Sequence, residues 1–163
     1  MKQKFKKIVG AVVVMFLLVS IFPQIPAEAA VSCKSLCGAA LKASGGSGNM
    51  EYQSDNAIDF GALPASARGK VKSIQYICDS KEVYSLCVIQ AKNTSGAKSL
   101  QKQLQKYKKN NCSSGYLSDY SSAEQEVFKN ALCGRKGKYV WYIALSTVKA
   151  VNGKGEKAIK KKL

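Results

Sequence analysis

The 163 residues of this chain include no histidine. Without imidazole the chain cannot form a Ser-His-Asp triad or a Cys-His pair, and it has no histidine ligand for a metal ion. Its cysteines include no Cys-x-x-Cys pair, the spacing typical of zinc ribbons, iron–sulfur sites and thioredoxin-like redox centres. The sequence therefore predicts a non-catalytic protein with no catalytic residue, no metal site and no cofactor.

Acidic residues are scarce as well. The chain has 10 Asp and Glu against 26 Lys and Arg, which gives a formal net charge of +16. Its hydrophobic content of 46% is ordinary for a globular domain and is too high for a disordered basic tail. A folded domain with such an excess of positive charge indicates anionic partners, whose binding depends on salt.

The beginning of the chain has the features of an export signal. A lysine-rich start is followed by the apolar run of residues 8–22, which is short for a membrane span, and then by small residues at the positions that signal peptidase reads. This pattern predicts a signal peptide over residues 1–29, cleavage between Ala29 and Ala30, and a secreted protein. Two alternatives remain open: an uncleaved signal anchor, and a lipid anchor on Cys33, whose preceding residues loosely resemble a lipobox.

All cysteines follow the predicted signal peptide. An even number of cysteines in an exported chain favours structural disulfides. The candidates are Cys33, Cys37, Cys78, Cys87, Cys112 and Cys133. We expect bridges among at least the last four, linking strands to the end of a helix. Free buried thiols and a metal site are the alternatives.

The first of two predicted β-hairpins has one strand that ends at Cys78 and a second that begins at Val83, with turn residues between them. With Ser80 and Lys81 at the tip, Cys78 and Val83 lie opposite each other. Cys87 on the second strand then shares a face of the sheet with Cys78, but the two are too far apart to bridge directly.

The second predicted hairpin joins residues 132–135 to residues 138–146 around Lys136 and Gly137. Its second strand has apolar residues on both faces. That pattern indicates a central strand that is covered on both sides.

Helix signals surround the two hairpins. The predicted helices are a short one over residues 33–41 capped by Ser32, a long one over residues 97–107, a short one with Ser121 and Glu124 as a capping box, and a cationic one over residues 156–163. The fold is therefore expected to be α+β: an antiparallel sheet of two β-hairpins covered by an amphipathic helix, with short N- and C-terminal helices.

The predicted organisation has three parts. Residues 1–29 form the signal peptide, residues 30–70 form an N-terminal helix and a polar loop that lead into the domain, and residues 71–163 form the α+β domain. No internal repeat relates the two hairpins, because they share a topology but not a sequence.

Several segments of the α+β domain follow a recurring pattern. They are residues 81–84 and 88–93, the helix 97–107, residues 123–131 and the Lys-Gly-Lys-Tyr turn within 136–140. Together they resemble the exported proteins and lipoproteins of clostridia-like Gram-positive bacteria that are grouped as domain of unknown function 4358. The resemblance covers about residues 71–160. It implies an extracytoplasmic α+β domain and no known activity.

Two groups of lysines are candidates for ligand binding. Lys98, Lys102, Lys106 and Lys109 recur at spacings of three and four, which places them along one side of the long helix, and Lys157, Lys160, Lys161 and Lys162 form a second patch. We expect them to contact an anionic cell-wall polymer or an anionic membrane surface. A partner protein is the other candidate, and nucleic acid is not expected. The alternative function is an enzyme that uses carboxylates or a reactive cysteine.

Overall fold

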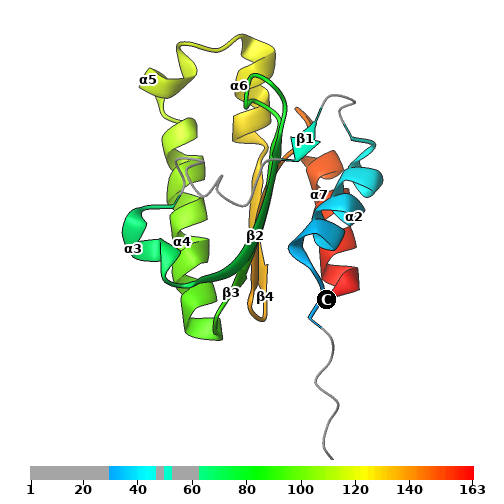
Figure 1. Cartoon of the computed structure of the whole chain (residues 1–163). Helices are drawn as coiled ribbons and strands as arrows, with labels where there is room; N and C mark the ends of the chain where they lie inside the picture. Colours follow the sequence, from blue (N-terminus) through cyan, green and yellow to red (C-terminus); the bar gives the residue numbers. More distant parts are fainter. Residues whose placement is uncertain (1–29, 47–49, 53–62) are drawn as a thin grey trace, which may run out of the picture. The chain divides into compact units, whose positions relative to one another are not determined.

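The computed structural model describes residues 30–46, 50–52 and 63–163, so the predicted signal peptide lies outside the described residues. Val31–Leu163 form one compact unit. This unit has the predicted α+β fold with an antiparallel sheet (Figure 1).

The sheet combines the two predicted hairpins with one further short strand. Its strands are β1 (Glu51–Tyr52), β2 (Val71–Cys78), β3 (Ser85–Ala91), β4 (Leu132–Lys136) and β5 (Tyr139–Ala144). Their order across the sheet is β1-β2-β3-β5-β4, and all neighbours are antiparallel. β3 pairs with β5, which joins the hairpins into one sheet and leaves β4 at an edge.

One long helix, α4 (Thr94–Asn111), covers one face of the sheet (Figure 1). Asn93 fixes its start, because the Asn93 side-chain oxygen accepts a hydrogen bond from the Gly96 N–H at 2.7 Å. The buried side of α4 packs on β3, β5 and β4, chiefly with its small and aliphatic residues. Three short helices add buried side chains to the same core: α3 (Ala65–Arg68), α5 (Ser114–Leu117) and α6 (Ser122–Lys129).

Two helices from the ends of the compact unit cover the opposite face. They are α2 (Cys33–Ser44) and α7 (Lys149–Lys162), which pack against each other. Ser32 caps α2 as predicted, since its hydroxyl accepts a hydrogen bond from the Ser35 N–H at 3.1 Å. Gly45 ends α2 in the left-handed conformation, with φ 76°, which a glycine adopts without strain.

The core on this face depends on a close approach of the two helices. Leu36 from α2, Ile159 from α7 and Trp141 from β5 are fully buried here. At the crossing of α2 and α7, a Cβ atom on Gly155 would lie only 2.7 Å from the Ser44 Oγ. Glycine at position 155 therefore sets the distance between the two helices.

β5 is the central strand that the sequence predicts. Trp141 and its neighbour Tyr142 are both fully buried, Trp141 in the core under α2 and α7, and Tyr142 in the core under α4. Successive residues of a strand point to opposite faces, so one strand supplies both cores.

The register of the first hairpin differs from the prediction. Cys78 lies opposite Ser85 and not opposite Val83. The predicted pairing is displaced by two positions, which preserves the face of every side chain because the period of a strand is two residues. Cys78 and Cys87 therefore share the face under α4, as predicted.

The cause of the register difference is a longer turn. The Asp79 N–H donates to the Tyr84 carbonyl at 3.0 Å, and the Asp79 carboxylate accepts from the Tyr84 N–H at 3.2 Å. Glu82, within this turn, has φ 55°. These contacts close the hairpin around more residues than the expected tip contains, so β3 begins later.

In the second hairpin Lys136 pairs with Tyr139, so Gly137 and Lys138 form the tip one residue later than predicted. Gly137 has φ 56°, which explains the glycine at this turn. The short helix α5 follows α4 directly and was not among the predicted helices.

The last helix starts well before its predicted beginning, because a buried side chain anchors its first turn. Asn152 is fully buried in α7. Its amide donates to the carbonyls of Asn130 at 2.9 Å and Ser146 at 3.1 Å, and its oxygen accepts from the Leu145 N–H at 2.9 Å. The glycines beside Asn152 are unfavourable for a helix in isolation, but these tertiary contacts offset that cost.

Candidate functional site

Four exposed lysines follow α4 on the side away from the sheet. They are Lys98, Lys102, Lys106 and Lys109, which we call the α4 lysine stripe. At 3.6 residues per turn these positions fall within an arc of about 80°, opposite the buried Ala97, Leu100 and Leu104. The stripe extends about 16 Å along the helix axis. The structure thus brings all four predicted lysines to one exposed side.

The α4 lysine stripe has no acidic partner among the described residues. The ion pairs in that part of the chain join Lys81 to Glu124 at 3.8 Å, Lys129 to Glu126 at 3.0 Å and Lys160 to Glu156 at 3.1 Å. Residues 97–118 contain no acid at all. Like charges without a counter-charge produce a positive potential that attracts anions.

The second predicted lysine patch is partly engaged within the protein. Its members Lys157, Lys160, Lys161 and Lys162 are exposed at the end of α7. Lys160 pairs with Glu156, and its ammonium lies 5.9 Å from the ring centroid of Trp141. Lys162 donates to the Ser35 Oγ at 3.1 Å. These contacts hold α7 on the sheet and on α2, so this patch offers less free charge than the α4 lysine stripe.

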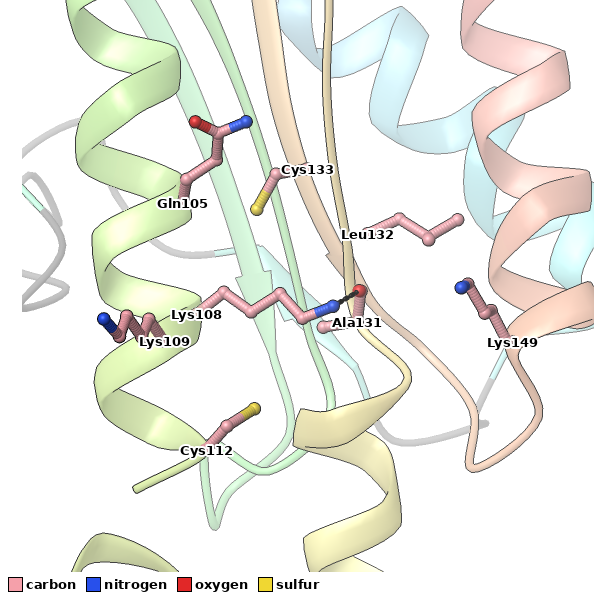
Figure 2. A pocket seen from close by; sticks show the side chains of 8 residues that line it. All are labelled: Gln105, Lys108, Lys109, Cys112, Ala131, Leu132, Cys133 and Lys149. Atoms are coloured by element: carbon pink, nitrogen blue, oxygen red, sulfur yellow. Dashed lines mark hydrogen bonds between the residues drawn. The ribbon is translucent and has the colours of Figure 1, made fainter.

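An open pocket of about 400 Å³ adjoins the end of the stripe (Figure 2). Its lining consists of Gln105, Lys108, Lys109, Cys112, Ala131, Leu132, Cys133 and Lys149. The half-buried Lys108 donates through Nζ to the Ala131 carbonyl at 2.5 Å. Figure 2 shows this side chain between the two cysteines, with Lys149 approaching from α7 beyond Leu132. The lining residues include three lysines and no carboxylate.

The two thiols that line the pocket are held in their neutral form. Burial raises the pKa of the Cys133 thiol to about 11 and also raises the pKa of the Cys112 thiol, although the nearby Lys108 ammonium lowers both. The Cys133 Sγ donates to the Leu104 carbonyl at 3.5 Å, and the Cys112 Sγ donates to the Phe128 carbonyl at 3.4 Å. A thiol that is desolvated and donates a hydrogen bond is a poor nucleophile.

All six cysteines lie among the described residues, and no disulfide joins any two of them. Cys33 and Cys37 belong to the core under α2 and α7, whereas Cys78, Cys87, Cys112 and Cys133 belong to or pack against the core under α4. The sheet separates these two groups. The predicted disulfides stay a prediction, and this arrangement limits them to pairs within one group.

Several carboxylates serve local structure. Glu124 completes the predicted capping box of α6, because it accepts hydrogen bonds from the Ser121 N–H at 2.9 Å and from the Ser121 hydroxyl at 2.6 Å. These two bonds hold the pKa of the Glu124 carboxyl below its ordinary value. Glu156 accepts from the Trp141 indole N–H at 3.2 Å. Each of these groups already has a structural partner.

The aromatic residues of β5 are not available as a stacking surface. Trp141 and Tyr142 are fully buried. The Tyr139 hydroxyl donates to the Val31 carbonyl at 2.8 Å and accepts from the Gln90 amide at 3.0 Å. The arrangement favours a role of these rings in packing.

Sequence reasoning did not find the pocket, although it singled out Lys109, Cys112 and Cys133. The pocket forms where the end of α4, the start of β4 and the start of α7 meet. Lys108 and Lys149 are forty-one positions apart in the sequence. No local pattern in the sequence relates them, because only the packing of α4 and α7 on the two sides of β4 brings them to one place.

The described residues contain no group of three or more Cys, Asp or Glu side chains that could hold a metal ion. Within the same part of the chain, no helix has the length and apolar character needed to cross a membrane. Comparisons with protein-family models, with curated proteins and with solved structures find no match for this chain. The interpretation of the site therefore depends on its own geometry and charge.

Proposed function

We propose that this protein is a secreted or cell-envelope module that binds an anionic polymer through the α4 lysine stripe and catalyses no reaction. The observation that carries the proposal is the stripe itself: four exposed lysines on one side of α4, without an acidic partner among the described residues. Export by the predicted signal peptide and kinship with the domain of unknown function 4358 proteins are parts of the same proposal. Export and this kinship would both locate the domain outside the membrane, where anionic cell-wall polymers are present.

The physical basis is electrostatic. A linear polyanion that lies along α4 can meet successive ammonium groups over about 16 Å, and each contact releases counterions from the polymer. The lysine stems remain flexible, which suits a polymer without a fixed shape. Such binding has little specificity for sequence or stereochemistry and falls steeply with salt.

Two features of the described residues support a binding module over an enzyme. The thiols that are candidates for a nucleophile have raised pKa values, with burial as the largest cause for Cys37, Cys87, Cys112 and Cys133. Glu124 and Glu156 already accept hydrogen bonds that hold helices in place. Neither set of groups resembles a pair poised for acid–base or nucleophilic work.

The test compares two variants with equal net charge. The stripe variant changes Lys98, Lys102, Lys106 and Lys109 to glutamine. The matched control changes four exposed lysines elsewhere, Lys42, Lys72, Lys138 and Lys154, to glutamine. Binding to polyphosphate is measured at several salt concentrations, together with the thermal midpoint of each protein.

We expect the stripe variant to lose most of its affinity at low salt, and the slope of log K against log salt to flatten by about 3 relative to wild type. The control should keep most of the slope, and both midpoints should stay close to that of wild type, because surface substitutions change stability little. Equal losses in the two variants would assign the binding to net charge and overturn the role of the stripe. Binding to anionic lipid vesicles but not to polyphosphate would assign the stripe to a membrane surface instead.

A further inference from the structure

The pocket beside the α4 lysine stripe has the charge and the size for one compact anion. We infer that it binds a dianionic phosphate group, such as a phosphomonoester at the end of the polymer that the stripe holds. Only the identity of the polymer in this inference rests on the proposed function. The phosphate site itself is inferred from the residues that line the pocket.

The ammonium of Lys108 is positioned by the protein before any ligand binds. One of its three N–H donors is used in the hydrogen bond to the Ala131 carbonyl, which leaves two for an anion. Lys108 is half-buried, so its charge is less screened by water than that of an exposed lysine. The fixed position also reduces the entropy that is lost on binding.

A second ammonium comes from the other side of the pocket. Lys149 begins α7 and is exposed, and Figure 2 shows it on the far side of Leu132 from Lys108. Lys109 also lines the pocket, but its side chain is directed to the outer side of α4, away from Ala131 (Figure 2). Lys109 therefore connects the pocket with the stripe. A polymer along α4 would meet the pocket at its end.

The balance of charge favours a dianion. Lys108 and Lys149 supply two positive charges, and no carboxylate lines the pocket to offset them. The charge of Lys129 on α6 also reaches the Cys112 thiol and lowers its pKa, but Lys129 is paired with Glu126 at 3.0 Å. A phosphomonoester carries about two negative charges at neutral pH, whereas a carboxylate or a phosphodiester carries one. The volume of about 400 Å³ also leaves room for the group that bears the phosphate.

The experiment is a titration of the isotope-labelled full-length domain, first with inorganic phosphate and then with sulfate, at constant ionic strength. The backbone amide signals of the pocket residues are followed by NMR. The variant is Lys149→Gln, and the matched control is Lys154→Gln, an exposed lysine of the same helix that does not line the pocket. A second variant, Lys108→Gln, is compared only after its thermal midpoint shows that it is folded.

We expect phosphate to shift the signals of Ala131, Leu132 and Cys133 in wild type, and Lys149→Gln to weaken this binding about three- to tenfold. Lys154→Gln should bind as wild type does. Between pH 8 and pH 5 the affinity for inorganic phosphate should fall as the dianion takes up a proton, while the affinity for sulfate stays constant because sulfate remains a dianion. The pocket thiols Cys112 and Cys133 stay neutral over this range, because burial raises the pKa of both.

Absence of shifts at the pocket, equal weakening by Lys149→Gln and Lys154→Gln, or phosphate binding that does not change with pH would each overturn the phosphate site. The failure of the proposed function is a separate result. If Lys149→Gln loses phosphate binding while the stripe variant still binds polyphosphate as wild type does, the phosphate site is supported and the proposed role of the stripe is wrong. If the stripe variant loses polyphosphate binding while the amide signals of the pocket residues never respond to phosphate, the role of the stripe is supported and the phosphate site is wrong.

Discussion

On one face of the sheet a single long helix, α4, packs across β3, β5 and β4, whereas on the other face α2 and α7 lie against each other. The α4 face buries aliphatic residues together with tyrosines, and the rings of Tyr107 and Tyr142 meet edge to face at 5.4 Å. The α2 and α7 face is closed by small residues at the helix crossing, with Gly155 next to Ser44.

The two faces of the sheet therefore differ in how much of their helix surface stays exposed. A pair of helices in close contact shields its inner sides. In this protein the Lys160 ammonium lies over the Trp141 ring of the sheet and Lys162 donates to Ser35 of α2, and both contacts help to fix α7 in place. On α4, by contrast, the four lysines of the outer side are exposed among the described residues. The α4 lysine stripe lies there, so the less enclosed face is the one on which charge can accumulate for a ligand.

The largest effect should come from a cavity in either core. Leu104→Ala under α4 and Leu36→Ala under α2 each remove a fully buried side chain, and we expect each to lower the free energy of unfolding by about 2–5 kcal/mol. Denaturant titrations followed by both fluorescence and circular dichroism measure the change. Since both cores share β5, a single transition should persist in each variant. Separate transitions for the two faces would contradict the shared sheet as the unit of folding.

The closeness of α2 and α7 is tested by adding one methyl group. Gly155→Ala places a Cβ atom 2.7 Å from the Ser44 Oγ, so we expect a loss of about 1–3 kcal/mol. Gly153→Ala is the matched control, because its Cβ would meet nothing within 4 Å. The control should gain about 0.5–1 kcal/mol from the better helix propensity of alanine. Thermal unfolding that shows the same sign for both variants would argue against a tight helix crossing.

The buried amide of Asn152 should matter nearly as much as the crossing. Asn152→Ala leaves two carbonyls and the Leu145 N–H without a partner in the interior, and we expect a cost of about 1–3 kcal/mol. Hydrogen exchange should speed up at Leu145 in the variant. The exposed Asn110 on α4 provides the comparison, because Asn110→Ala removes an asparagine without burying an unsatisfied group. Similar thermal midpoints of unfolding for the two variants would contradict the role of Asn152 in anchoring α7.

The smallest effect concerns the capping box beside the α4 face. Ser121→Ala should cost about 1 kcal/mol. The pKa of Glu124 is lowered in the folded state, so its contribution is present above the ordinary glutamate pKa of 4.5 and is lost as the pH falls through the folded pKa. Unfolding of Glu124→Gln between pH 7 and pH 3 should therefore depend less on pH than that of wild type. An unchanged pH dependence would mean that the carboxyl has no preferred partner in α6.

Short sequence patterns predict those features of the fold that depend on residues close together in the chain. The sequence predicts the caps of α2 and α6 because Ser32 and Ser121 accept hydrogen bonds from N–H groups three residues away. The central position of β5 was readable because a strand buried on both sides is apolar at every position. The lysine spacing on α4 was readable for the same reason, since a helix of known length fixes which residues share a side.

Tertiary contacts decided the rest. The register of the first hairpin depends on Asp79 and Tyr84, whose hydrogen bonds enlarge the turn, and the start of α7 depends on Asn152, whose partners lie outside α7. The pocket exists only where three elements meet, with Lys108 and Lys149 brought together around β4. The sequence by itself determined the order of the main helices and strands and which sides of them are charged, because those properties depend on neighbours a few positions apart. The tertiary structure decided which charges remain free and which share a pocket, because both depend on the distances between elements far apart in the chain.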